Sequence, residues 1–143
     1  MITTDFDLFF QGDYPLPRHG PQILEHALQA VCRKTLGREI KIESNGKPFH
    51  RTYEFAEEHL RAQASKSRVK ISKFYMIGDN PETDIAGANA KGWVSILVKT
   101  GVFDVNESVN GNDKEHPATH VVDNFEEAVK LIYKLENLSP ESN

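Results

Sequence analysis

The sequence predicts an α/β fold in which helices cover a mainly parallel sheet. Strand-like and helix-like segments alternate from residue 39 onward, as they do in β-α-β units. Two strand candidates, 74–77 and 94–98, are short apolar runs typical of buried parallel strands. Ligands of such sheets bind beyond the carboxyl ends of the strands. The polar residues at those ends are therefore the first candidates for a site.

The part of the chain before residue 46 predicts two short strands and one helix. The first strand ends near Thr4 and is followed by a turn-rich stretch containing Gly and Pro. The helix begins at Pro21, which suits a first helical position, and ends at Gly37. Alternation over 39–43 predicts the second strand. The apolar residues of this helix lie on one face, made of Ile23, Leu24, Ala27, Leu28, Val31 and Leu36.

The rest of the chain continues the alternation. A Gly46-Lys47-Pro48 turn leads into a helix with Tyr53, Ala56, Leu60 and Ala64 on one face. Strand 74–77, a short helix over about 83–91, strand 94–98, a surface loop over 104–117 and strand 120–122 follow. A closing helix is capped by Asp123 or Asn124 and turns four apolar side chains inward, those of Phe125, Ala128, Val129 and Ile132. We expect residues 137–143 to form a disordered tail.

Composition excludes several classes of function. The 143 residues carry a net charge of −4 with both signs mixed along the chain, so nothing resembles a nucleic-acid surface. No apolar run approaches the length of a membrane span. Cys32 is the only cysteine, which rules out an internal disulfide and is compatible with a reducing intracellular compartment. The six histidines are scattered, and none pairs with a second residue at metal-ligand spacing. The first residues do not have the pattern of a secretory signal.

Two carboxylates follow the apolar strand at 74–77. Asp79 comes directly after Gly78, and Asp84 lies five residues later at the start of a helix. The intervening loop can turn both side chains toward one point above the strand end, where oxygen ligands suit Mg²⁺. The alternative reading makes Asp79 a turn former and Asp84 a helix cap. The full string from Tyr75 to Ala88 favours the metal site.

A lysine precedes the second helix within Gly46-Lys47-Pro48. The ammonium of Lys47 can reach a phosphate held over the strand ends. Such a turn is by itself usually only a turn, and it becomes informative through the acidic motif downstream.

Together these motifs resemble the haloacid-dehalogenase (HAD) superfamily of hydrolases. The acidic string resembles its fourth motif. The Gly-Lys-Pro turn resembles its third motif in members with a large α/β cap, and 4–7 resembles the segment that follows the cap. The narrower resemblance is to a eukaryotic, often mitochondrial subfamily, the HAD-like hydrolase domain-containing 5 (cat eye syndrome critical region 5) type. It rests on Asp7-Leu8, Leu16-Pro17-Arg18, Gly46-Lys47-Pro48, Thr52-Tyr53, Phe55-Ala56-Glu57, Gly78-Asp79-Asn80-Pro81 and Thr100-Gly101-Val102.

The resemblance implies an Mg²⁺-dependent phosphatase that works through a phospho-aspartyl intermediate. Lys47, Asp79 and Asp84 would be its catalytic residues. Asp79 and Asp84 would hold the metal, and Lys47 would hold a phosphate oxygen. Arg18 lies in a segment near the rim of the active site in capped members, which makes it a candidate for contact with the substrate. The substrate would be a small phosphorylated metabolite.

The resemblance also implies that residues 1–136 are the C-terminal portion of the core, without the central strand that carries the nucleophile. Asp5-Phe6-Asp7 looks like the nucleophile motif, but only four residues precede it and Leu8 and Phe9 follow it. We therefore reject that assignment. We expect the chain to pair with the remaining N-terminal half of the core and its cap. The parent protein would then be an enzyme, and the subfamily resemblance implies a mitochondrial location for it. This chain alone would be inactive.

Two other functions compete with the phosphatase. The first is a non-catalytic module, derived from the same superfamily, that binds phosphate or a protein. The second is a receiver-like signalling domain, which also arranges Asp and Lys around Mg²⁺. In receivers the acidic residues precede the lysine, whereas here Lys47 precedes Asp79. The order of the motifs therefore speaks against a receiver.

Overall fold

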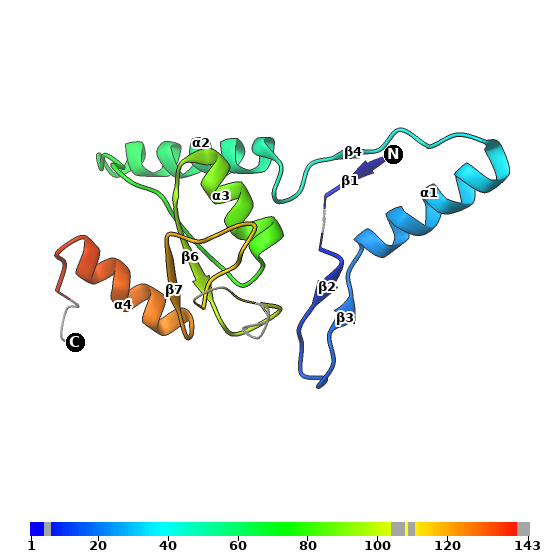
Figure 1. Cartoon of the computed structure of the whole chain (residues 1–143). Helices are drawn as coiled ribbons and strands as arrows, with labels where there is room; N and C mark the ends of the chain where they lie inside the picture. Colours follow the sequence, from blue (N-terminus) through cyan, green and yellow to red (C-terminus); the bar gives the residue numbers. More distant parts are fainter. Residues whose placement is uncertain (5–6, 104–107, 109–110, 140–143) are drawn as a thin grey trace.

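The structure is a computed structural model that describes residues 1–4, 7–103, 108 and 111–139. Its largest unit is a parallel sheet of three strands in the order β5-β6-β7, formed by Tyr75–Gly78, Val94–Val98 and His120–Val122. Helices flank this sheet, so the predicted α/β class with parallel strands is confirmed (Figure 1). The strands lie within or next to the predicted ranges.

The core lies on both faces of β6, because successive side chains of a strand point to opposite sides. Leu97 packs with Ile85 on one face. Ile96 and Val98 pack with Ala128 of α4 (Phe125–Leu135) on the other. The face with Ile85 is covered by the π-helical turn η1 (Pro81–Ile85) and the short helix α3 (Ala86–Lys91), against which α2 (His50–Lys66) packs.

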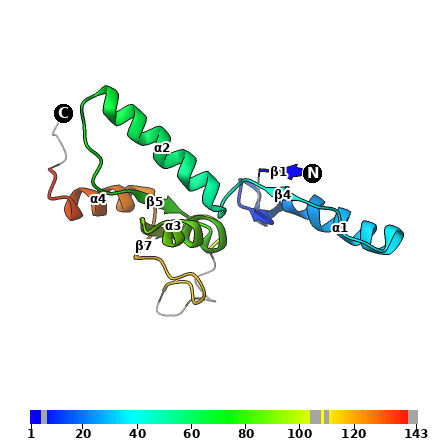
Figure 2. The same cartoon turned by 90° about the horizontal axis from the view of Figure 1, so that it is seen from above.

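The N-terminal part forms two small sheets and one helix, away from the three-stranded sheet (Figures 1 and 2). Strand β1 (Ile2–Thr3) pairs in parallel with β4 (Glu43–Ser44). Strands β2 (Phe9–Phe10) and β3 (Arg18–His19) form an antiparallel pair, so the stretch predicted only as turns contains a hairpin. Helix α1 (Gln22–Leu36) is preceded by Pro21 and ends at Gly37, whose φ is +65°, as predicted.

Strand β1 and strand β5 belong to different sheets. The strand near Thr3 and the strand that leads to Asp79 are therefore not adjacent. Among the described residues, β5 pairs along one edge only, with β6. The opposite edge has no strand beside it in that part of the chain.

Two local expectations are wrong, those for the second strand and for Phe125. The second strand is Glu43–Ser44 rather than 39–43, because both backbone groups of Ile40 bond to the side chain of Gln29 instead of to a neighbouring strand. Much of the apolar face of α1 is exposed, since Leu24 is 62%, Val31 57% and Leu36 59% exposed. Phe125 is also 62% exposed instead of pointing inward.

Within the described residues, no helix is long and apolar enough to span a membrane. The predicted surface loop falls partly on 104–107 and 109–110, and the predicted tail partly on 140–143. Those positions lie outside the described residues.

Candidate functional site

The loop after β5 carries the acidic motif on a turn of unusual winding. Asn80 begins η1 by accepting a hydrogen bond from the amide of Glu82 at 3.0 Å, which satisfies a backbone group that the turn would otherwise leave without a partner. The carbonyl of Asn80 also accepts from the amides of Asp84 and Ile85. Isolated π-helical turns of this kind occur frequently at functional sites.

Asp84 is buried inside this turn, with a side chain only 4% exposed. One carboxylate oxygen accepts from the Lys47 ammonium at 2.6 Å, and the other accepts from the amide of Asn80 at 3.2 Å. A Cβ atom on Gly78 would lie 2.3 Å from this carboxylate. Glycine at position 78 therefore leaves the space that Asp84 occupies.

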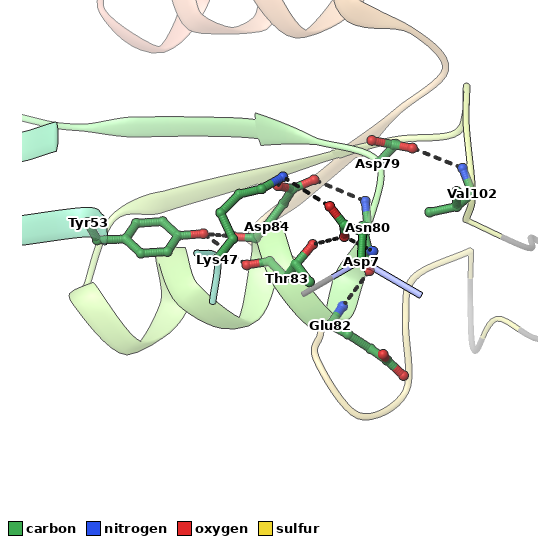
Figure 3. A network of polar contacts seen from close by, with 9 residues as sticks. All are labelled: Asp7, Lys47, Tyr53, Asp79, Asn80, Glu82, Thr83, Asp84 and Val102. Carbon is green, nitrogen blue, oxygen red and sulfur yellow. Dashed lines mark hydrogen bonds and ion pairs between the residues drawn. The ribbon is translucent and has the colours of Figure 1, made fainter. Parts of the chain in front are cut away.

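Asp79 points to a second loop, the one that follows β6. Its carboxylate accepts from the amide of Val102 at 2.9 Å (Figure 3). Gly101 has a φ of +136°, and a Cβ atom there would lie 2.0 Å from an Asp79 oxygen. The resemblance noted at Thr100-Gly101-Val102 thus coincides with the loop that receives the Asp79 carboxylate.

Lys47 reaches the site from the turn before α2. Burial alone would lower the pKa of Lys47, but the hydrogen bond and charge of Asp84, followed by the charges of Asp7 and Asp79, raise that pKa above its ordinary value. The lysine is therefore charged at neutral pH. Its side chain remains 39% exposed, so it can also meet a ligand.

Asp7 is a member of the site that the sequence reasoning did not assign. One of its oxygens accepts from the Asn80 side chain at 2.7 Å and from the Thr83 hydroxyl at 3.0 Å. Its other oxygen lies 4.0 Å from the Lys47 ammonium. Asp7 belongs to the rejected motif Asp5-Phe6-Asp7, of which residues 5 and 6 lie outside the described part. The presence of an Asp-x-Asp pattern was the signal that could have indicated it.

Tyr53 supports the site from α2. It is 3% exposed, and its hydroxyl donates to the backbone carbonyls of Thr83 at 2.9 Å and Asp84 at 3.1 Å. Burial raises the pKa of Tyr53, so it remains a hydrogen-bond donor at neutral pH. Its ring fills the space beside Gly87, where a Cβ atom would lie 2.2 Å away. The sequence placed Tyr53 on an apolar face and within the family resemblance, but did not assign it to the site.

The structure brings three of the four predicted site residues together. Lys47, Asp79 and Asp84 line one cavity of about 190 Å³, together with residues of the N-terminal segment and of the loops after β5 and β6: Asp7, Phe9, Phe10, Gln11, Asn80 and Val102. Arg18 is exposed on β3 and does not line this cavity.

The carboxylates fit an Mg²⁺ ion only in part. Mg²⁺ in proteins is commonly held by one or two carboxylates together with waters and substrate oxygens. Asp79 and Asp84 line the cavity and can supply the carboxylates. No cluster of three or more His, Cys, Asp or Glu side chains in the described ranges is arranged to hold a metal. The donor set is thus compatible with Mg²⁺ but needs further oxygen ligands.

Comparison with known proteins identifies similar sequences. Residues 44–128 match the family model described as HAD-hydrolase-like. The chain is 36% identical over 126 residues to a cardiolipin synthase (CMP-forming)/mitochondrial hydrolase fusion protein of Schizosaccharomyces pombe, across 87% of this chain. It is 30% identical over 149 residues to a mitochondrial hydrolase of Saccharomyces cerevisiae, across 90% of this chain. The chain spans only 20% and 41% of the lengths of these two relatives.

Solved structures have the same fold over most of the chain. A hypothetical protein of Pyrococcus horikoshii is 23% identical to this chain, with a TM-score of 0.64. The match covers 92% of this chain and 43% of the length of that protein. A 4-nitrophenylphosphatase of Thermotoga maritima is 24% identical to this chain, with a TM-score of 0.62. The match covers 90% of this chain and 43% of the length of that protein.

Proposed function

The chain belongs to the HAD-hydrolase-like family, and on that premise we propose that it is part of an Mg²⁺-dependent phosphatase. The observation that carries the proposal is the convergence of Lys47, Asp79 and Asp84 on one cavity beyond the end of β5. The 4-nitrophenylphosphatase among the structures of the same fold agrees with this class of reaction.

Lys47 would bind a phosphate oxygen. Its ammonium is charged and partly exposed, and it lies beside the carboxylates of Asp84 and Asp7 (Figure 3). Lys47 also lines the cavity. A fixed positive charge at this place stabilises the negative charge that develops on the phosphoryl group in the transition state. Its ion pair with Asp84 orients the ammonium before the substrate arrives.

Asp79 and Asp84 would hold the metal. When bound, Mg²⁺ would offset the negative charge of the phosphate and of the carboxylates around it. The two residues have different roles in holding the site together. Asp84 is fixed by Lys47 and the amide of Asn80, and Asp79 ties the loop after β5 to the loop after β6 through Val102.

The nucleophile would come from the remaining N-terminal half of the core, which also carries the cap. In this proposal an aspartate of that half attacks phosphorus while the bond from phosphorus to the substrate oxygen breaks, and a second aspartate two residues later protonates the leaving group. Water then hydrolyses the phospho-aspartyl intermediate and releases phosphate. The free edge of β5 within the described residues and the separate β1–β4 sheet support the insertion of further strands between them. Unpaired strand edges readily accept another strand.

The substrate would be a small phosphomonoester. A second cavity of about 580 Å³ shares Phe9, Asn80 and Val102 with the first, and offers room for the organic part of the substrate. The names of both curated relatives include a mitochondrial hydrolase, so we propose a mitochondrial location for the parent protein.

The proposal is tested by assaying the longest natural form of the protein beside this chain, with Mg²⁺ and a panel of small phosphomonoesters. We expect Mg²⁺-dependent phosphate release from the longer form and none from this chain alone. Phosphate binding without turnover by either form would instead support the non-catalytic module. Turnover by this chain alone would make Asp5-Phe6-Asp7 the nucleophile motif and overturn the half-core proposal.

A further inference from the structure

Asp7 connects the N-terminal segment to the acidic loop. It lies 73 residues before Asn80 and 76 before Thr83, yet one of its oxygens accepts hydrogen bonds from both side chains, at 2.7 and 3.0 Å. The carboxylate is only 25% exposed, and hydrogen bonds to an ionised and partly buried group are stronger than those between neutral groups. The contact is therefore a specific link between two distant parts of the chain.

The turn that carries Asp84 is held from two directions. Tyr53 binds the backbone carbonyls of Thr83 and Asp84, whereas Asp7 binds the side chains of Asn80 and Thr83 (Figure 3). The backbone N–H of Asn80 in turn donates a hydrogen bond to the Asp84 carboxylate. Displacement of Asn80 would thus move a group that fixes the Asp84 carboxylate.

Asp7 also acts on the lysine. Its second oxygen lies 4.0 Å from the Lys47 ammonium, and an oxygen of Asp84 lies 2.6 Å from the same ammonium. The ammonium is therefore attracted by two carboxylates from different parts of the chain. Both attractions limit the positions that the flexible lysine side chain can adopt.

We propose that Asp7 is a positioning residue that fixes the turn 80–84, and through that turn the Asp84 carboxylate and the Lys47 ammonium. The inference rests on the proposed function in that the fixed groups are those expected to bind metal and phosphate. Asp7 itself orients Asn80, Thr83 and Lys47.

The test uses the longest natural form of the protein and two measurements. The variants are Asp7→Asn, which keeps the shape but removes the charge, and Asp7→Ala, which removes every acceptor. The matched control is Asp123→Asn, because Asp123 is 76% exposed and pairs with Lys99 outside the cavity. Hydrogen–deuterium exchange by mass spectrometry reports the turn directly. The Mg²⁺ concentration that gives half-maximal activity reports the metal site.

We expect faster exchange in peptides covering 80–91 of both Asp7 variants, with peptides of α4 unchanged and the control equal to wild type. The half-maximal Mg²⁺ concentration should rise about tenfold in Asp7→Asn, the lower end of what loss of a partner of a metal ligand costs. Unchanged exchange over 80–91, or exchange that rises equally in α4, would overturn the inference. If the wild type hydrolyses nothing, the proposed function fails while the exchange experiment still decides the role of Asp7.

Discussion

The Lys47 ammonium lies 2.6 Å from an oxygen of Asp84, a residue 37 positions further along the chain whose side chain is 4% exposed. A buried carboxylate without a compensating charge is costly. Because the Gly-Lys-Pro turn supplies that charge, the third and fourth motifs are joined in this structure by a direct contact. The same pair gives the cavity both its positive and its most buried negative group.

Replacement of Lys47 by Met should lower the free energy of unfolding, because Asp84 would keep its buried charge and lose its partner. Breaking a buried pair costs about 3–5 kcal/mol, and the 39% exposure of Lys47 reduces this to about 1–2 kcal/mol. Chemical denaturation measures the change. Lys99→Met, which breaks the exposed pair with Asp123, should change stability by less than about 0.5 kcal/mol. Equal effects of the two substitutions would contradict this account of the Lys47 pair.

Replacement of Tyr53 by Phe should loosen the turn that bears Asp84 without emptying the core. The ring would still pack beside Trp93 and Gly87, but the carbonyls of Thr83 and Asp84 would lose the hydroxyl as a donor. Loss of a hydrogen bond of this kind costs about 0.5–1.5 kcal/mol. Denaturant unfolding gives the stability, and exchange at residues 80–91 gives the local effect. A Phe variant as stable as the wild type would show that the hydroxyl contributes nothing.

Replacement of Gly87 by Ala should be destabilising through steric overlap alone. A Cβ atom there would lie 2.2 Å from the Tyr53 ring, so the ring or α3 must move. Overpacking of this kind costs about 1–3 kcal/mol. Gly12→Ala is the control, since its nearest contact would be an ordinary 3.8 Å. Thermal unfolding of both variants measures the effect. A Gly87→Ala protein with the same unfolding temperature as the wild type would refute the close approach of Tyr53.

The attachment of α4 should weaken at acidic pH. Hydrogen bonds from Lys73 and Tyr75 hold the pKa of Glu136 below its ordinary value of 4.5. A carboxylate of this kind stabilises the fold fully above pH 4.5, and the contribution is lost as the pH falls through the lowered folded value. Unfolding midpoints measured down to pH 3 should therefore converge for wild type and Glu136→Gln. The control is Glu58→Gln, at an exposed position on α2. Any difference between its unfolding midpoint and that of the wild type should stay the same as the pH falls.

Much of the C-terminal half could be predicted from the sequence, because its signals are local. Strand composition, the αL glycine at Gly92 and the Asn124 cap determine elements that the structure reproduces. The α1 periodicity identified an apolar face but not whether anything covers it. The β4 boundary depended on Gln29, a side chain 11 residues from Ile40.

The same distinction holds for the site. Lys47, Asp79 and Asp84 stand in compact motifs, and the structure places all three around one cavity. Asp7 and Tyr53 contribute through partners far away in the chain. Asp7 binds Asn80, 73 residues later, and Tyr53 binds Thr83, 30 residues later. Such contacts exist only after folding. The Asp-x-Asp pattern at 5–7 was a signal for Asp7, whereas no spacing rule indicates the role of Tyr53. The role of Arg18 in substrate binding remains a prediction.

The central claim is that this chain supplies the metal-binding carboxylates of a phosphatase. The most direct test measures phosphomonoester hydrolysis by the longest natural form as a function of Mg²⁺ concentration, for the wild type, Asp79→Asn and the control Asp123→Asn. We predict that the wild type and the control respond to Mg²⁺ alike, and that Asp79→Asn loses at least about tenfold in activity or metal affinity. An Asp79→Asn protein with the activity and Mg²⁺ response of the wild type would contradict the account.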